Sequence, residues 1–181
     1  LPHGTQRIGI GAVMGTPLSI LHVLAPADVG GLETVVRALA SGHTALGHSV
    51  EIAAILSSPP SPLVPAARAA GLRVHIIESP ARSVLPEYRG VKELLTKGKF
   101  DVLHSHGYRS DILDIRLARN LGIPSTTTLH GFSATDWKAR LYEWLQLRST
   151  RCASAIVAVS RNVADRVVAS GTRSDLVHLI R

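Results

Sequence analysis

The sequence alternates between continuous apolar runs and segments whose apolar residues recur at helical spacing. The apolar runs predict strands at residues 19–25, 49–56, 71–77, 100–104, 124–129, 155–159 and 176–180. The helical spacing predicts helices at 32–46, 84–97, 108–121, 134–151 and 160–169. Repeated strand–helix units predict a parallel sheet with helices on both faces. We therefore expect an α/β, Rossmann-like doubly wound sheet of about seven strands. Its expected order is 3-2-1-4-5-6, with the first and fourth strands at the switch point.

Length and composition suit one folded domain. The chain has 181 residues, of which 45% are hydrophobic, and such a length buries a sizeable core. We place the domain at residues 19–181. We interpret residues 1–18 as a leader or an expression remnant, because the chain starts at Leu1 and Met14 is a candidate start. The run GIGAVMG at 9–15 precedes the first strand, whereas a dinucleotide fingerprint follows it.

The charge of the chain predicts the kind of partner. A net charge of +7 favours a phosphorylated ligand or an acidic lipid surface. Nucleic acid is a poor fit, because aromatic residues make up only 4% of the chain and the cations are scattered. Cys152 is the single cysteine, which excludes an internal disulfide and fits a cytoplasmic protein.

Polar residues and glycines follow four of the predicted strands. Gly30 and Gly31 come after the first, the run HSHGYRSD at 104–111 after the fourth, His130 after the fifth, and SRN at 160–162 after the sixth. In the predicted order these loops are neighbours at the carboxyl edge, where open α/β sheets bind ligands. We expect them to converge on one cleft.

The paired glycines and the histidines are the candidate ligand groups. Without a Cβ, Gly30 and Gly31 let the backbone approach an anion at a helix N-terminus; a tight turn explains them equally well. The chain holds nine histidines, but no acidic or cysteine ligand is paired with HSH, so we predict no metal site. His106 and His130 are expected to contact a ligand instead.

Three stretches together carry a family resemblance: HVLAPADVGGLETVVRALASGHTALGHSVEIAAIL, DVLHSHGYRSDILDIRLARNLGIPSTTTLHG and ASAIVAVSRNVADRVV. In order and spacing they resemble the N-terminal domain of GT-B glycosyltransferases of family four. The resemblance implies a retaining enzyme with a nucleotide-sugar donor and no metal or other cofactor. The family places a second Rossmann domain, which holds the donor, after this one. By resemblance, this chain is the acceptor-side half and is inactive alone.

The resemblance also implies roles for single residues. His130 matches the family histidine that contacts the transferred sugar and is implied to be catalytic. Phosphate or donor-diphosphate contacts are implied for Gly30, Gly31 and Arg161. Acceptor contacts are implied for His106, Tyr108, Arg109 and Ser160. The acceptor is a hydroxyl of a sugar, a lipid-linked compound or another molecule, and the irregular segments 57–65 and 78–90 are expected to select it.

The predicted helix at 134–151 allows two interpretations. Trp137, Leu141, Trp144 and Leu145 share one stripe, flanked by cations. This pattern allows peripheral contact with the inner membrane surface. A core helix with a solvated basic face is the interpretation that we prefer.

Two other functions stay open. The chain could be a binding module that kept the fold and cleft without catalysis. It could also be an unrelated Rossmann-type enzyme that binds a dinucleotide, although strand 49–56 ends in serines rather than an acidic residue.

Overall fold

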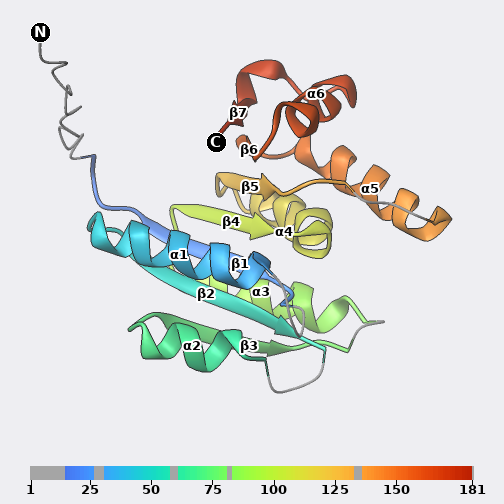
Figure 1. The fold of residues 1–181 in the computed structure, drawn as a ribbon. Helices are drawn as coiled ribbons and strands as arrows, with labels where there is room; N and C mark the ends of the chain where they lie inside the picture. Colours follow the sequence, from blue (N-terminus) through green and yellow to red (C-terminus); the bar gives the residue numbers. More distant parts are fainter. Residues whose placement is uncertain (1–14, 27–30, 58–60, 81–82, 133–135, 181) are drawn as a thin grey trace, which may run out of the picture.

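A single parallel sheet forms the centre of the molecule (Figure 1). The computed structural model describes residues 15–26, 31–57, 61–80, 83–132 and 136–180. Within these residues the strand order is β3-β2-β1-β4-β5-β6-β7. The strands are β1 (Ser19–Leu24), β2 (Ser49–Leu56), β3 (Arg73–Glu78), β4 (Val102–His106), β5 (Ser125–Leu129), β6 (Ala155–Ala158) and β7 (Val177–Leu179). The predicted fold class and strand order are confirmed, with β1 beside β4 at the switch point.

Helices cover both faces of this sheet. They are α1 (Gly31–Ala45), α2 (Leu63–Ala69), α3 (Leu85–Lys97), α4 (Tyr108–Asn120), α5 (Trp137–Thr150) and α6 (Arg161–Ala169), with a 3-10 turn, η1, at Ser174–Leu176. In Figure 1, α1 and α2 lie in front of β1, β2 and β3, and α3 lies behind them. This doubly wound arrangement follows from the reversal of strand order at β1 and β4.

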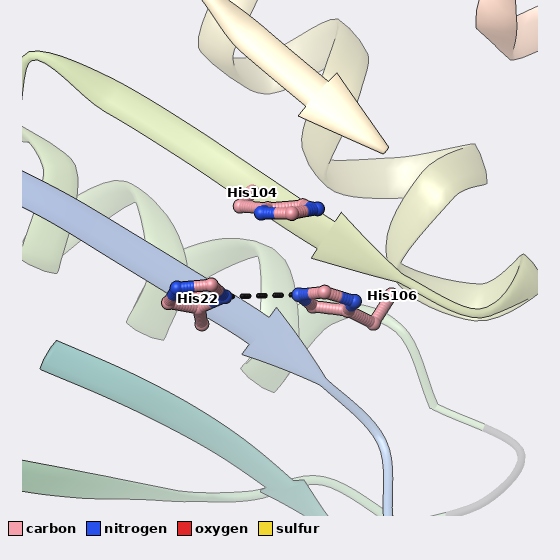
Figure 2. Close-up of side chains that lie close together, drawn as sticks. All are labelled: His22, His104 and His106. Carbon is pink, nitrogen blue, oxygen red and sulfur yellow. Dashed lines mark hydrogen bonds between the residues drawn. The ribbon is translucent and has the colours of Figure 1, made fainter. Parts of the chain in front are cut away.

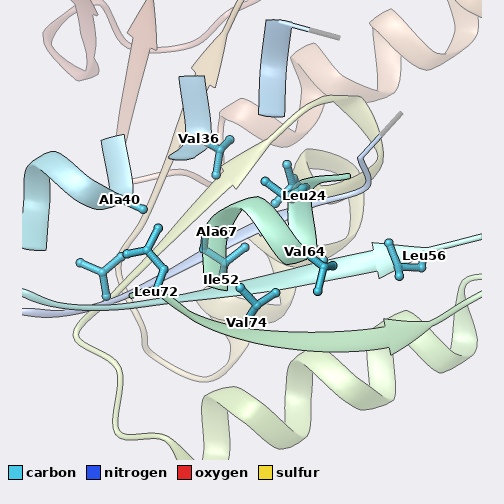
Figure 3. Close-up of a cluster of buried hydrophobic side chains, with 12 residues drawn as sticks. Leu24, Val36, Ala40, Ile52, Leu56, Val64, Ala67, Leu72 and Val74 are labelled. Carbon is cyan, nitrogen blue, oxygen red and sulfur yellow. The ribbon is translucent and has the colours of Figure 1, made fainter. Parts of the chain in front are cut away.

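Alternation along the strands divides the apolar core between the two faces. Leu24 of β1 and Ile52 of β2 pack with Val36 of α1 and Ala67 of α2 in one cluster (Figure 3). Leu21 and Val23 point to the opposite face, because successive strand side chains alternate. There they pack with Val91 and Leu95 of α3 and with Leu117 and Ala118 of α4. Both faces of β1 are therefore fully buried.

The structure corrects two predicted element boundaries. β4 continues to His106, two residues beyond the prediction, because pairing with β1 and β5 extends that far. Helix α2 (Leu63–Ala69) was not predicted, and its first turn overlaps the stretch 57–65 that we expected to be irregular. Pro65 is tolerated there, since N–H groups in the first helical turn have no intrahelical partner. The irregular rim after β2 is thus shorter than predicted. Residues 1–14 of the predicted leader lie outside the described residues.

Helix α5 buries a different face from the one that we preferred. Trp137, Leu141 and Trp144 are 70%, 46% and 56% exposed. The buried residues of α5 are Gln146, Ser149 and Thr150. The core interpretation of the aromatic stripe is therefore wrong, because polar side chains that find hydrogen-bond partners fill the interior instead. None of the described helices has the length and apolar character needed to cross a bilayer.

Candidate functional site

A cleft of about 450 Å³ lies at the carboxyl edge of the sheet, at the switch point between β1 and β4. It is lined by Gly31, Leu32, Val35, Gly107, Tyr108, Thr128, His130, Gly131 and Gln146. These residues belong to the start of α1, the start of α4 directly after β4, the end of β5 with the residues that follow it, and α5. The predicted convergence of the segments after the first, fourth and fifth strands is confirmed.

Gly31 places the N-terminus of α1 in the cleft. It is the first residue of the helix, and it is exposed. An added Cβ would meet no atom within 4 Å. The first N–H groups of a helix have no intrahelical partner, and the helix dipole favours an anion beside them. This end of α1 can therefore hold a phosphate against the backbone. Gly30 lies outside the described residues.

His130 follows β5 directly and is exposed to the cleft. Partial burial lowers its pKa below the usual value of 6.5. The imidazole is therefore neutral at pH 7, where one ring nitrogen donates a hydrogen bond and the other accepts one. Such a group can contact a sugar hydroxyl or a ring oxygen without bringing charge into the cleft.

Three buried histidines lie beneath the switch point, on the same face of neighbouring strands (Figure 2). His22 of β1 pairs in register with His104 of β4, and His106 lies two residues further along β4. The Nδ1 atom of His22 lies 2.9 Å from the Nε2 atom of His106, and Nε2 of His104 lies 2.8 Å from the hydroxyl of Thr128. His22 was not among the predicted site residues, although strand alternation places it on this face.

Burial keeps this histidine cluster uncharged. The pKa of His22 is lowered to about 2, mainly by desolvation on burial and further by electrostatic repulsion from His104 and His43. Burial, with His43 and His130, lowers the pKa of His104 to about 3. Burial also lowers the pKa of His106 well below 6.5. All three rings are neutral at physiological pH. The bond between His22 and His106 joins β1 to β4, and the bond between His104 and Thr128 joins β4 to β5.

The cluster is also the group of described residues that could hold a metal ion. One nitrogen from each of His22, His104 and His106 lies within 4.8 Å of the others. Neutral imidazoles suit Zn²⁺ or Cu²⁺ better than Mg²⁺. Nδ1 of His22 and the Nε2 atoms of His104 and His106 already make hydrogen bonds, whereas Nδ1 of His106 is buried without a partner among the described residues. The group contains no carboxylate. These hydrogen bonds orient the rings, and the absence of a metal site stays a prediction.

A buried carboxylate, that of Asp111, orients one side chain of the cleft lining, Gln146. Asp111 of α4 accepts hydrogen bonds from Ser105 at 2.6 Å, Thr127 at 2.7 Å and Gln146 at 2.7 Å. Burial raises the pKa of Asp111 to about 6, against these hydrogen bonds, which favour the ionised form. The bond from Gln146 fixes the orientation of its side chain beside the cleft. Gln146 has no sequence signal, since it lies on the face of α5 that we expected to be solvated.

Arg109 is directed away from the cleft. Its Nε donates to Glu87 of α3 at 2.5 Å, and its Nη2 donates to the hydroxyl of Ser79 at 2.8 Å. Glu87 is fully buried, and its burial raises the pKa of that carboxyl although Arg109 opposes the shift. These contacts join α4 to α3 and to the segment after β3. An acceptor contact of Arg109 stays a prediction.

The remaining predicted residues lie beside the cleft rather than in its described lining. His106 is 1% exposed. Ser160 is the N-cap of α6, where its hydroxyl accepts from the N–H of Val163 at 3.3 Å. Arg161 is exposed at the first position of the same helix. Of the predicted site residues that are described, the structure brings Gly31, Tyr108 and His130 together.

The profile of the family Glycosyltransferase Family 4 matches residues 29–181. The chain belongs to glycosyltransferase family 4. A D-inositol 3-phosphate glycosyltransferase from Arthrobacter sp. (strain FB24) is 32% identical over 116 aligned residues, and the alignment covers 57% of this chain and 27% of the relative. A UDP-Gal:alpha-D-GlcNAc-diphosphoundecaprenol alpha-1,3-galactosyltransferase from Escherichia coli is 31% identical over 72 aligned residues, and the alignment covers 37% of this chain and 19% of the relative.

Solved structures share the fold of this family 4 domain. Anabaena Alr3699/HepE in complex with UDP superposes with a TM-score of 0.70 at 15% identity, over 90% of this chain and 43% of that one. At this identity the likeness concerns the fold alone. Family membership argues against an unrelated dinucleotide enzyme. The chain spans about a quarter or less of the two curated relatives named above.

Proposed function

We propose that the chain is the acceptor-side half of a retaining glycosyltransferase, which moves a sugar from a nucleotide-sugar donor to an acceptor hydroxyl. The supporting observation is the cleft at the switch point, where the start of α1, Tyr108 and His130 meet. The Escherichia coli relative is named for a UDP-Gal donor, and the Anabaena neighbour was solved with UDP. Both support a nucleotide sugar as the donor.

The geometry suggests how these groups share the reaction. A leaving diphosphate gains negative charge as the bond to the sugar breaks, and a helix N-terminus stabilises such charge. The start of α1 at Gly31 is suited to this task. Arg161, exposed at the start of α6, can add a cation on the same edge of the sheet. Neutral His130 would hydrogen-bond the sugar as the acceptor hydroxyl attacks the same face.

The decisive experiment replaces His130 by alanine in the longest natural polypeptide that contains this chain. We expect kcat/KM for transfer from a nucleotide sugar to fall about 100-fold or more, as when one positioned hydrogen-bonding group is lost. His178→Ala is the matched control, because His178 is an exposed histidine on β7. Unchanged activity of His130→Ala would overturn the proposed cleft.

Two parts of the proposal have their own readouts. Proton NMR of the product gives the anomeric configuration, and inversion would contradict the retaining mechanism. We expect residues 1–181 alone to show no transfer, because most donor contacts are assigned to a second domain. Transfer by the isolated chain would overturn the assignment to an acceptor-side half.

We also propose peripheral contact with an anionic membrane surface on the cytoplasmic side. Its basis is the exposed stripe of Trp137, Leu141 and Trp144 on α5. Lys138 and Arg148 lie near the rings of Trp137 and Trp144, at 5.6 and 5.9 Å from the ring centroids. Exposed aromatic residues flanked by cations fit the interface of acidic lipids.

Vesicle sedimentation tests this contact. Binding to vesicles that contain phosphatidylglycerol should weaken severalfold in Trp137→Ala/Trp144→Ala and should fall with added salt. Vesicles of phosphatidylcholine alone are the charge control, and Tyr88→Ala, at an exposed position of α3, is the protein control. The proposal would be contradicted if the wild type and Trp137→Ala/Trp144→Ala bound equally well to vesicles with and without phosphatidylglycerol.

A further inference from the structure

We propose that a second hollow, beside the cleft, binds an additional sugar ring of the acceptor against a pair of tyrosines. The inference rests on the proposed function and adds a substrate class to it: an acceptor of at least two linked sugars. It concerns Tyr108, Phe132 and Tyr142, which we call the aromatic subsite.

The subsite continues the cleft. The hollow has a volume of about 370 Å³, and it shares Tyr108, Gly131 and Gln146 with the cleft that contains His130. The shared residues form the wall between the two spaces. A ligand whose reacting hydroxyl lies near His130 can therefore extend past Tyr108 into the second hollow. Its volume lies in the range of small-molecule sites, about 300–1,000 Å³.

Two aromatic rings from different helices meet in this hollow. The ring centroids of Tyr108, at the start of α4, and Tyr142, on α5, lie 5.3 Å apart with an angle of 39° between the planes. Both side chains are about half exposed, at 54% and 48%. A hexose has an apolar face of C–H groups that packs against such rings. The phenolic hydroxyls can hydrogen-bond to its edge.

The third ring, that of Phe132, packs against Arg166 of α6. Phe132 lines the hollow, and the guanidinium of Arg166 lies 4.4 Å from its ring centroid. Arg166 also donates to Glu143 at 2.9 Å. This contact fixes a carboxylate of the lining. The subsite is therefore supported by α6 as well as by α4 and α5.

The polar lining favours a sugar over other occupants. Asp136, Lys138 and Glu143 surround the aromatic rings. Three charged groups disfavour an acyl chain, since burying a charge against hydrocarbon is costly. Because Arg166 pairs with Glu143, the two carboxylates are balanced by two cations, so the hollow gathers no net positive charge for a phosphate. Neutral hydroxyl groups, by contrast, can donate to the carboxylates and accept from the ammonium.

The subsite and the membrane stripe lie on different faces of α5. Tyr142 and Gln146 are four residues apart and line the hollow, and Lys138 borders both features, since its ammonium also lies 5.6 Å from the centroid of the Trp137 ring. Trp137, Leu141 and Trp144 lie on the neighbouring face and are exposed. Residues four apart share one side of a helix. Variants of Tyr142 therefore report on the hollow without altering the aromatic stripe.

Saturation-transfer difference NMR with the natural polypeptide tests the proposal without requiring turnover. The probes are maltose, cellobiose and lactose, with methyl glucoside as the monosaccharide. We expect signals from one ring of at least one disaccharide, reduced severalfold in Tyr142→Ala and kept in Tyr142→Phe. Tyr88→Ala, an exposed tyrosine on α3, should match the wild type. If no disaccharide gives a signal that depends on Tyr142, the subsite is overturned.

The transfer assay separates this inference from the proposed function. With a disaccharide acceptor, Tyr142→Ala should raise KM about tenfold while kcat changes less than twofold. With the monosaccharide, KM should rise no more than about twofold, because this acceptor loses only the support that Tyr142 gives to Tyr108. If His130→Ala abolishes transfer and Tyr142→Ala affects both acceptors equally, the subsite is wrong and the transferase proposal stands. If the wild type transfers nothing yet the NMR signal depends on Tyr142, the transferase proposal fails and the sugar site stands.

Discussion

The Nδ1 atom of His22 lies 2.9 Å from the Nε2 atom of His106, so one hydrogen bond joins the two strands at the switch point. The third member of the cluster, His104, is paired with Thr128 of β5. Imidazoles buried in this way remain neutral in the folded protein, whereas unfolding exposes them to protonation. The cluster therefore links folding stability to pH.

Replacing His104 by glutamine should reduce the acid sensitivity of the fold. The folded-state pKa of His104 is lowered to about 3, so below about pH 6.5 only the unfolded chain takes up its proton. Stability contributed by neutral His104 is lost as pH falls, by about 2 kcal/mol between pH 7 and pH 5. Urea unfolding at both pH values should show that the stability of His104→Gln relative to wild type rises by this amount.

The matched control for this experiment is His178→Gln, at an exposed histidine of β7. It should follow the wild type at both pH values. Buried acids with raised pKa values act in the opposite direction, so the difference between variant and wild type is the quantity to measure. A difference that does not change with pH would contradict the neutral cluster.

Asp114→Asn should stabilise the protein increasingly as pH rises. Asp114 is fully buried, and burial, with Glu87 and Asp111 nearby, raises its pKa well above 3.8. The folded state must then bind a proton that the unfolded chain releases above about pH 3.9. The free energy of unfolding of the wild type therefore falls by about 1.4 kcal/mol for each pH unit until the folded-state pKa of Asp114 is reached. The melting temperatures of Asp114→Asn and wild type, compared between pH 5 and pH 7, measure this effect.

Asp165→Asn, at an exposed position of α6, provides the comparison. Its effect on the melting temperature should be the same at both ends of this range. If Asp114→Asn also shifts the melting temperature by a constant amount, Asp114 is ionised in the folded protein.

Arg109→Ala should destabilise the domain by about 3–5 kcal/mol, because it leaves a buried carboxylate without its partner. Glu87 is fully buried, and its Oε2 accepts from Arg109. The double variant Arg109→Met/Glu87→Leu should recover much of this loss, since no unpaired charge remains. Lys97→Ala, which breaks an exposed pair with Glu93, should have little effect on urea unfolding. An unaltered midpoint for Arg109→Ala would argue for a role in binding instead.

Gly31→Ala separates ligand approach from turn geometry. The added Cβ meets no atom within 4 Å, so the melting temperature should be unchanged or slightly higher. If a phosphate contacts the start of α1, the methyl group displaces it, and kcat/KM should fall about tenfold to 100-fold. Gly42→Ala, in the same helix and equally open, should keep full activity. Equal activity of both variants would contradict phosphate binding at the start of α1.

The sequence alone determined the arrangement of strands and the edge where the cleft lies. Apolar runs such as 49–56 identify strands buried on both faces, and the rules for crossovers then fix their order. These are local patterns combined with general topology, so β2 was predicted to the residue. The position of His130 and Tyr108 at one edge followed from the same reasoning.

Only the tertiary structure decided which polar groups are buried. Gln146 is buried because Asp111 accepts its hydrogen bond, and Arg109 turns from the cleft because Glu87 binds it. Likewise, the stripe containing Trp144 is exposed, although apolar periodicity favoured burial. A polar side chain can be buried where a partner removes the cost of desolvation. That partner comes from a distant element, so local sequence patterns do not reveal it.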